Sequence, residues 1–209
     1  MKFFGLSLVS MLLMASCTTE APVQSADVQS FDEVLTTRRS VRNYDASKSI
    51  SETEVRELLI ASQDAPSWAN VQSSRYYVAI SPEKVAAVQE LIGENNKKNV
   101  QGAPVLIVST YQKGLSGFFG GNATNEVGDG WGAYDNGLSN AYLILKARAM
   151  GFDTLIMGMR DADGLRSLFD IPETEAIMAV ISLGYRASEP NRPSRRDIDE
   201  VREPGGPAG

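Results

Sequence analysis

The sequence predicts an α+β protein in which helices flank a central sheet. Helical and strand patterns alternate along most of the chain, and two strand segments, residues 105–108 and 176–183, are continuous apolar runs. Runs of this kind suit a sheet that is covered on both faces. The order of the elements, two helices followed by alternating strands and helices, is that of a mixed helix and sheet protein.

Two capping-box patterns and a proline mark where helices begin. In the boxes, Ser30 with Glu33 and Ser51 with Glu54, the side chains satisfy backbone N–H groups at the helix start. Pro82 stands at a first helical position, where proline costs no hydrogen bond. Apolar residues recur at helical spacing after these starts. The predicted helices cover about residues 31–37, 52–63, 82–92, 131–150 and 161–169.

Strands are predicted where β-branched, aromatic or other apolar residues run together over a short stretch. The glycine-rich segment 112–130 predicts a long loop, which in a compact domain is more often functional or disordered than a plain connector. The tail after Gly184 is rich in proline and arginine and predicts an extended arm. The predicted strands cover residues 76–80, 105–108, 154–157 and 176–183.

The 209-residue chain contains no histidine and a single cysteine. Without histidine there is no Ser-His-Asp or Cys-His nucleophile system, no imidazole general base and no His-ligated zinc. A single cysteine excludes an intrachain disulfide, a redox Cys-x-x-Cys pair and a tetracysteine metal site. We therefore predict no metal centre, and we expect any redox or group-transfer chemistry to reside in a bound cofactor.

The N-terminal segment has the pattern of a secretory signal. Lys2 precedes an apolar run over residues 3–14, which is shorter than the roughly 20 residues of a membrane-spanning helix. Small residues then lead to Cys17, as in a bacterial lipobox. We expect residues 1–16 to be a lipoprotein signal peptide and Cys17 to become the lipidated first residue. The alternative is a buried core cysteine near an ordinary cleavage site.

Residues 17–30 are polar and lack sustained periodicity, which predicts a flexible tether between the lipid and the domain. Residues 31–209 then form one domain. The expected product is an exported bacterial lipoprotein of the cell envelope, with the lipid as its only membrane contact. The formal net charge of −6 disfavours nucleic acid as a partner.

Two arginine clusters stand out against this acidic background. One is Arg-Arg-Ser-Val-Arg at residues 38–42, and the other lies in the tail at Arg192, Arg195 and Arg196. Guanidinium groups this close repel one another unless an anion lies among them, and their forked donors match phosphate oxygens. The clusters are therefore either a shared phosphate site or two solvated surfaces with ion pairs to neighbouring aspartates.

The segment Ala65-Pro66-Ser67-Trp68-Ala69-Asn70-Val71-Gln72 is a polar loop between a predicted helix and a predicted strand. Its hydroxyl and amide groups are of the kind that grip the edge of a heteroaromatic ring, although the same residue types also form ordinary turns. Gly158 follows a predicted strand and permits close approach of the backbone to a flat ligand. The chain has no Gly-x-Gly-x-x-Gly turn and no P-loop pattern, so the cofactor must be held in another way.

Taken in this order, these segments resemble the FMN-dependent nitroreductase family from about residue 31 to residue 201. The resemblance implies an α+β nitroreductase-like fold with a mixed central sheet, in an intertwined homodimer with two FMN molecules at the interface. The segments that carry it are Arg38–Arg42, Ala65–Ser67 with Asn70 and Gln72, Ala103–Val105, Tyr134–Ala147, Met150–Thr154 before Gly158, Ile171–Pro172 and Leu183–Tyr185.

The resemblance also implies which residues bind FMN. Those that hold the phosphate and ribityl chain are Arg38, Arg39, Ser40 and Arg42, joined from the tail by Arg195. Those that line the flavin ring, partly from the opposite subunit, are Pro66, Ser67, Asn70 and Gln72. The backbone that faces the flavin edge near N5, where hydride arrives and leaves, is that of Met157, Gly158 and Met159.

Three positions depart from the family pattern. Ser73-Ser74 stands where Pro-Trp is common. Pro193 stands where the tail commonly has a basic residue, for which Arg192 is the candidate substitute. Gly158-Met159-Arg160 stands where Gly-Gly-Phe is often seen. These departures affect single contacts with the flavin more than the choice of cofactor.

The activity that the resemblance implies is a two-step oxidoreduction. NADH or NADPH reduces the flavin and leaves, and a small-molecule acceptor such as a nitroaromatic compound or a quinone replaces it. Because of export, a reduced quinone or a protein is the alternative donor. Phe118, Phe119 and Trp131 are candidates for a substrate cover or, alternatively, for residues that plug a dimer interface. The alternative function is a lipid-anchored flavin-binding or interaction protein without turnover.

Overall fold

The computed structural model describes residues 29–202. The expected signal peptide, Cys17, most of the expected tether and residues 203–209 lie outside the described residues. Within the described part of the chain, no helix is both long enough and apolar enough to cross a membrane.

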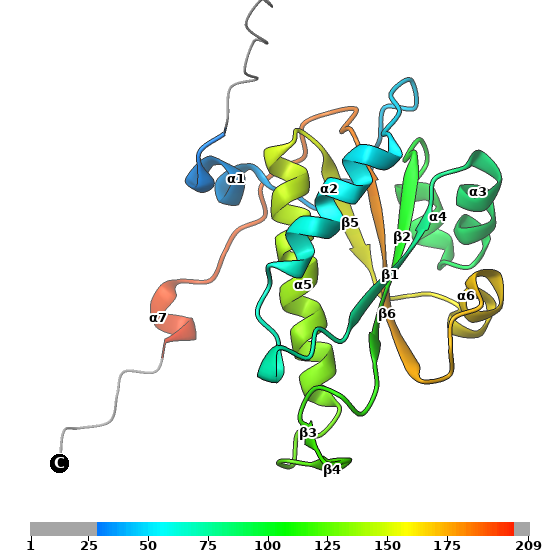
Figure 1. Cartoon of the computed structure of the whole chain (residues 1–209). Coiled ribbons are helices and arrows are strands. Elements are labelled where there is room, and N and C mark those ends of the chain that lie inside the picture. The colour runs from blue at the N-terminus through cyan, green and yellow to red at the C-terminus, as the bar shows by residue number, and fades with distance from the viewer. Residues whose placement is uncertain (1–28, 203–209) are drawn as a thin grey trace, which may run out of the picture.

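A four-stranded sheet forms the centre of the protein (Figure 1). Its strands lie in the order β1 (Ser74–Ala79), β2 (Val105–Gln112), β6 (Glu175–Gly184) and β5 (Asp153–Met157). All three strand pairs are antiparallel, and the parallel pairing of the described chain is an isolated bridge between Ser40 and Thr154. The central strands β2 and β6 are buried on both faces, which explains their continuous apolar sequences.

Helices cover both faces of this sheet (Figure 1). On one face lie α2 (Glu52–Gln63) and α5 (Gly130–Ala149). On the other face lie α3 (Pro82–Glu90), α4 (Glu94–Asn99) and α6 (Ala162–Phe169). The fold is thus the α+β arrangement that the sequence predicts. The four-stranded sheet is however antiparallel and not mixed as expected, since the parallel pairing beside β5 within residues 29–202 is an isolated bridge and not a strand.

The sheet divides the apolar core into two clusters. Ile107 of β2 belongs to the same cluster as Leu58 of α2, whereas its neighbour Leu106 belongs to the same cluster as Leu165 of α6. Consecutive residues of a strand point to opposite faces, so one apolar run serves both clusters.

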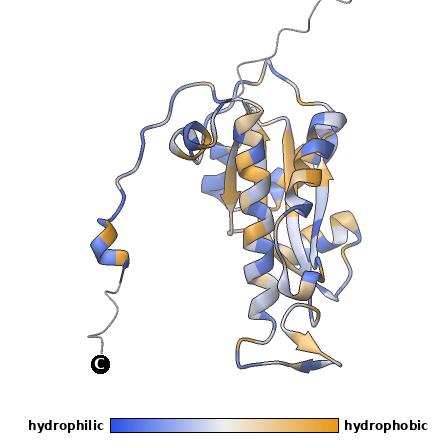
Figure 2. Cartoon of the chain, turned by 60° about the vertical axis from the view of Figure 1, so that its left-hand side comes forward, coloured by the Kyte–Doolittle hydropathy of each residue, from blue (hydrophilic) through white to orange (hydrophobic). Residues whose placement is uncertain are grey.

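Several short elements complete the fold. The helix α1 (Phe31–Thr37) begins at the Ser30 capping box, in which both reciprocal hydrogen bonds are present. After β6, an arm leaves the body of the domain and carries α7 (Figures 1 and 2). The other short elements are η1 (Trp68–Asn70), β3 (Phe118–Phe119), β4 (Asn122–Ala123) and α7 (Ile198–Val201).

The structure corrects the predictions mainly where the sequence has no apolar residues at helical or strand spacing. The predicted helix over residues 82–92 ends at Glu90, and the polar run Glu-Asn-Asn-Lys-Lys-Asn that follows Gly93 forms α4, which was not predicted. The predicted loop over residues 112–130 contains the β3–β4 hairpin, and the predicted extended tail contains α7.

The placement of the core can be tested at α2. Leu58 is fully buried, so Leu58→Ala leaves a cavity against the sheet and should lower the free energy of unfolding by about 2–5 kcal/mol. Ile60→Ala, on the same helix but at a side chain that is 45% exposed, should lower it by about 1 kcal/mol or less. Denaturant unfolding followed by circular dichroism measures both. If Leu58→Ala and Ile60→Ala lowered the free energy of unfolding equally, the placement of Leu58 in the core would be wrong.

Candidate functional site

One cavity contains the predicted phosphate residues. This arginine cavity, as we call it, has a volume of about 380 Å³ and lies between residues 38–43 and the C-terminal arm. Arg192 and Arg196 do not line it. The predicted residues that it brings together are Arg38, Arg39, Ser40, Arg42 and Arg195. The two arginine clusters therefore meet, and Arg195 is the tail arginine that joins them.

Backbone hydrogen bonds hold the arginine-bearing segment beside the sheet. The N–H of Val41 donates to the carbonyl of Thr154 in β5 at 3.0 Å. The N–H of Ala187, at the start of the arm, donates to the carbonyl of Asn43 at 3.0 Å. The segment is thereby fixed between the edge strand and the arm, which explains how residues from the two ends of the domain share one cavity.

A buried carboxylate ties the same segments together. The side chain of Asp153 is 1% exposed and accepts hydrogen bonds from Arg186 Nε at 2.8 Å and Nη2 at 2.5 Å, while Arg148 Nη1 lies 3.6 Å away. Arg186 also donates to the Thr37 carbonyl at 3.3 Å and to Glu189 at 2.5 Å. Its hydrogen bonds to Asp153 raise the pKa of Arg186, and its hydrogen bond to Glu189 lowers the pKa of that carboxyl. One network thus joins α1, β5, α5 and the arm.

The lining of the arginine cavity contains four arginines and no acidic residue. Burial lowers the pKa of Arg38, and the neighbouring charges of Arg195 and Arg39 lower it further. The Nε of Arg39 is buried without a hydrogen-bond partner among the described residues. An unsatisfied buried donor is costly, and an anion among mutually repelling guanidinium groups stabilises all of them. The residues present therefore fit a phosphate group.

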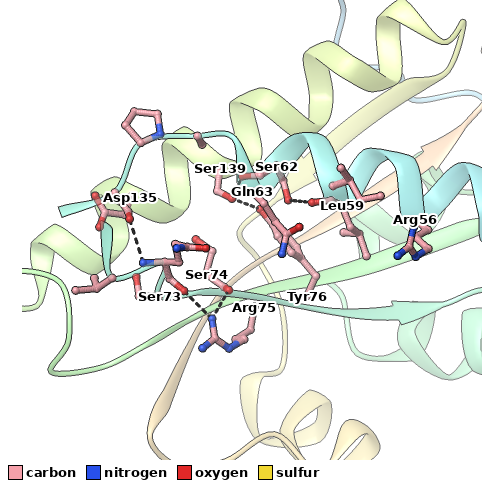
Figure 3. A pocket seen from close by; sticks show the side chains of 16 residues that line it. Arg56, Leu59, Ser62, Gln63, Ser73, Ser74, Arg75, Tyr76, Asp135 and Ser139 are labelled. Atoms are coloured by element: carbon pink, nitrogen blue, oxygen red, sulfur yellow. Dashed lines mark hydrogen bonds between the residues drawn. The ribbon is translucent and has the colours of Figure 1, made fainter. Parts of the chain in front are cut away.

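The second cavity contains the predicted ring-binding loop. This polar cavity has a volume of about 730 Å³ and lies between α2, the loop residues that flank η1, β1 and the first half of α5 (Figure 3). Pro66, Ser67 and Gln72 line it. Asn70 does not line it but lies beside it, with its Oδ1 3.4 Å from Gln72 Nε2.

The ring-binding loop has an uncommon backbone conformation. Asn70 and Gln72 have φ values of 57° and 50°, in the left-handed region that residues other than glycine rarely adopt. Ser67 Oγ accepts a hydrogen bond from the N–H of Gln72 at 3.0 Å, and Asp135 of α5 accepts one from the N–H of Trp68 at 2.9 Å. Backbone strain of this kind concentrates at functional sites, so the loop is a candidate ligand-binding element.

The third group of predicted residues lies at the end of β5. The Met157 side chain is buried in the core, whereas Gly158 and Met159 are exposed. The helix α4 places Asn96 at this strand end, where its Nδ2 lies 3.4 Å from the Met159 carbonyl, which also accepts from the N–H of Gly93 at 3.1 Å. Asn96 is a candidate ligand-binding residue that sequence reasoning missed, because its polar run carries no helical pattern.

The edge of β5 joins this strand end to the arginine cavity. β5 has one neighbour in the sheet, β6, and on its other side Ser40 pairs with Thr154. From Thr154 to Gly158 the strand rises by about 13 Å. This edge suits an elongated ligand with a phosphate at one end and a ring system at the other.

The candidate cover residues share one region near the start of α5 (Figure 1). Phe118 and Phe119 form β3, and the Phe119 side chain is 82% exposed. Trp131 donates through Nε1 to Asn125 Oδ1 at 3.0 Å and meets the Tyr134 ring edge to face at 5.7 Å. The three predicted aromatic residues therefore lie together, but at the far end of α5 from the arginine cavity.

The two cavities lie at opposite ends of α5. Asp135 lines the polar cavity, whereas Arg148 joins the ion-pair network beside the arginine cavity. Along the helix axis these residues are about 20 Å apart. One chain alone therefore does not bring all the predicted FMN residues into one site.

Comparison with models of protein families matches residues 35–185 to the nitroreductase family. The chain belongs to the nitroreductase family. It is 28% identical over 204 residues to YdgI of Bacillus subtilis (strain 168), which carries the provisional name NAD(P)H nitroreductase, and the match covers 83% of this chain and 96% of YdgI.

Solved structures share the nitroreductase-like fold. A provisionally named nitroreductase in complex with FMN, from Exiguobacterium sibiricum, has a TM-score of 0.74 at 24% identity and covers 84% of this chain and 97% of its own. The enone reductase CLA-ER of a gut-bacterial fatty acid saturation metabolism has a TM-score of 0.75 at 20% identity and covers 87% of this chain and 99% of its own. The sheet and helices described above are thus those of this nitroreductase family.

The Asp153 network is testable by matched amide substitutions. Asp153→Asn removes a carboxylate that is 1% exposed and that Arg186 and Arg148 share, so the free energy of unfolding should fall by about 3 kcal/mol or more. Glu189→Gln, at a side chain that is 71% exposed and also bonded to Arg186, should cause no measurable loss. Urea denaturation measures both. If the two variants unfold alike, Asp153 is not the centre of the network.

Proposed function

We propose that this nitroreductase family member is an FMN-dependent oxidoreductase that passes electrons from NADH or NADPH to a nitroaromatic compound, a quinone or a similar small-molecule acceptor. The observation that carries the proposal is the lining of the arginine cavity at one end of the β5 edge, which has four arginines, no acidic residue and a buried Arg39 Nε without a partner among the described residues. The FMN bound to the Exiguobacterium sibiricum protein and the name of YdgI support it.

In this proposal the arginine cavity holds the phosphate of FMN. Arg38, Arg39 and Arg42 supply guanidinium forks from one side, and Arg195 supplies one from the arm. The Ser40 hydroxyl lies in the same cavity and completes the donor set. A phosphate dianion here would offset the burial and the repulsion from Arg195 and Arg39, which together lower the pKa of Arg38.

The flavin ring would lie at the exposed end of β5. The exposed residues Gly158 and Met159 lie there, and the hydrogen bond from Asn96 to the Met159 carbonyl would hold their backbone in place beside the ring edge. When bound, FMN accepts hydride from the donor and passes electrons to the acceptor. The protein then has to bind and orient the flavin and its reaction partners and to exclude water. None of these tasks needs a histidine, which agrees with a chain that has none.

A homodimer would complete the site. Within one chain the ring-binding loop is about 20 Å along α5 from the arginine cavity, so Pro66, Ser67, Asn70 and Gln72 would reach the flavin from the second copy. The arm supports this arrangement, because Ile198 and Val201 of α7 are 67% and 63% exposed. An arm that crosses to the partner would bury these apolar side chains. Phe118, Phe119 and Trp131 would cover the substrate from the same dimer interface.

The phosphate assignment can be tested with neighbouring arginines. Arg195→Ala removes a guanidinium fork from the cavity and should weaken FMN binding about tenfold, and Arg38→Ala with Arg39→Ala about 100-fold. Arg196→Ala changes the adjacent residue, which does not line the cavity, and should leave affinity unchanged. Fluorescence titration of the apoprotein with FMN gives the dissociation constants. Unchanged FMN retention in the Arg38 and Arg39 variant would rule out this phosphate site.

The N-terminal pattern supports lipid anchoring as a further part of the proposal. Residues 1–16 would be removed and Cys17 would carry the lipid, which would attach the domain to the cell envelope. An exported domain has little access to NADH, so a reduced quinone or a protein is the alternative electron donor.

Lipid anchoring can be tested in a bacterial host that is fed radioactive palmitate. The chain should carry the label and sediment with membranes. Cys17→Ser should abolish both the label and sedimentation, since it removes the thiol that takes the lipid, whereas Thr19→Ala should keep both. A labelled Cys17→Ser protein would show that the lipid is attached elsewhere.

A further inference from the structure

Arg160 lies on the link from β5 to α6, directly after the segment assigned to the flavin edge (Figure 1). The proposed function places Gly158 and Met159 beside that edge, and the nitroreductase pattern often has a phenylalanine at the next position. This chain has an arginine there. A positive charge therefore stands where the pattern has an apolar ring, and its contacts indicate what it does.

The guanidinium group of Arg160 binds two backbone carbonyls. Nη1 donates to the Gly158 carbonyl at 3.0 Å, and Nη2 donates to the Ile177 carbonyl of β6. The strand β5 ends at Met157, which pairs with Val180, so Ile177 lies beyond the last residue pair of β5 and β6. Arg160 thus joins the chain that follows β5 to the part of β6 that β5 does not cover.

Stability alone does not explain an arginine at this position. Its Nε is buried without a hydrogen-bond partner among the described residues, and a buried unsatisfied donor is costly. Within residues 29–202, Arg160 also makes no salt bridge. The phenylalanine of the family pattern would bring no polar group to bury, so we looked for a role of the cation at the site.

The carbonyl that Arg160 binds belongs to the peptide group between Gly158 and Met159. None of the described residues has a cis peptide bond, and in a planar trans peptide the C=O and the N–H point in opposite directions. The Met159 N–H therefore points away from the guanidinium group. In this part of the chain it makes no hydrogen bond, and the Met159 side chain is 74% exposed. This N–H is a free donor at the end of β5.

Hydrogen bonds polarise and hold this peptide group. A hydrogen bond to the carbonyl of a peptide group strengthens its N–H as a donor, because linked hydrogen bonds polarise one another. A charged donor such as Arg160 has a larger effect than a neutral one. Beyond the peptide group, the carbonyl of Met159 accepts from the N–H of Gly93 at 3.1 Å. The free N–H is thus strengthened and fixed in direction before a ligand arrives.

We infer that Arg160 is a positioning residue for the flavin and acts through the peptide group of Gly158 and Met159. The inference rests on the proposed function, which assigns this peptide group to the ring edge near N5. Negative charge develops on the ring when it is reduced, and a strengthened N–H with a cation behind it stabilises that charge. Arg160 therefore favours reduced over oxidised FMN and raises the reduction potential. It takes part in no covalent step.

The reduction potential of bound FMN tests the inference. The purified holoprotein is titrated anaerobically with dithionite beside a redox dye of known potential. Arg160→Gln should lower the preference for reduced over oxidised FMN about tenfold, which is a fall of about 30 mV for a two-electron couple. Arg160→Phe, which introduces the residue of the family pattern, should cause the same fall even if the glutamine variant does not fold. Arg160→Lys keeps the charge and should recover most of the potential.

Arg166 supplies the matched control. Its guanidinium group also binds backbone carbonyls, those of Ile171 and Glu175 at 3.1 Å each, but it does not contact Gly158. Arg166→Gln should therefore leave the potential unchanged. If Arg160→Gln and Arg160→Phe keep the potential of the unaltered protein while the flavin cycles, the inference is wrong and the proposed function stands.

A measurement without flavin tests the polarised peptide group by itself. In apoprotein labelled with ¹⁵N-methionine, the amide proton signal of Met159, identified by its loss in Met159→Leu, should move upfield in Arg160→Gln and stay in place in Arg166→Gln. An unchanged signal in Arg160→Gln would overturn the inference whatever the flavin does. If the signal moves but the protein binds no FMN, the proposed function fails and the role of Arg160 toward the flavin falls with it.

Discussion

The candidate site depends on the ion-pair network centred on Asp153. Leaving a carboxylate that is 1% exposed without charged partners is costly, and Arg186 and Arg148 supply such partners to Asp153. Because Arg186 also binds the end of α1 and Glu189 of the arm, the contacts that satisfy Asp153 also fix the two walls of the arginine cavity. Arginines from opposite ends of the domain are thereby brought together despite their mutual repulsion, which an anionic ligand would relieve.

The helix α5 sets the distance between the ring-binding loop and the arginine cavity. Near its start, Asp135 holds the strained ring-binding loop, and near its end, Arg148 contacts Asp153. A rigid helix keeps these two regions about 20 Å apart. In the proposed homodimer, a flavin would therefore take the arginine cavity from one chain and the ring-binding loop from the second copy. The same homodimer would bury the exposed apolar residues of the arm, so the proposed site and the arm point to one assembly.

Sequence reasoning succeeded where the physical signal is local. Capping boxes gave the bounds of α1 and α2, and apolar runs located the central strands, although β2 continues to Gln112, beyond the predicted end at residue 108. The repulsion within residues 38–42 pointed to an anion site that the structure joins to Arg195. It failed where the signal is not local. The polar helix α4 with Asn96 has no apolar period, and the pairing of Asp153 with Arg186 leaves no pattern along the sequence. Spacing along the chain likewise could not show that the ring-binding loop and the arginines lie at opposite ends of one helix.

The central claim is that the arginine cavity binds the phosphate of a flavin that cycles between a donor and an acceptor. The most direct measurement is the absorbance spectrum of the purified protein during an anaerobic titration with NADH or NADPH, followed by nitrofurazone or menadione. Our account predicts a yellow protein whose flavin absorbance is bleached by the donor and restored by the acceptor. A bound flavin that no donor and acceptor pair can cycle would favour a flavin-binding role without turnover. A colourless protein that added FMN cannot reconstitute would contradict the account.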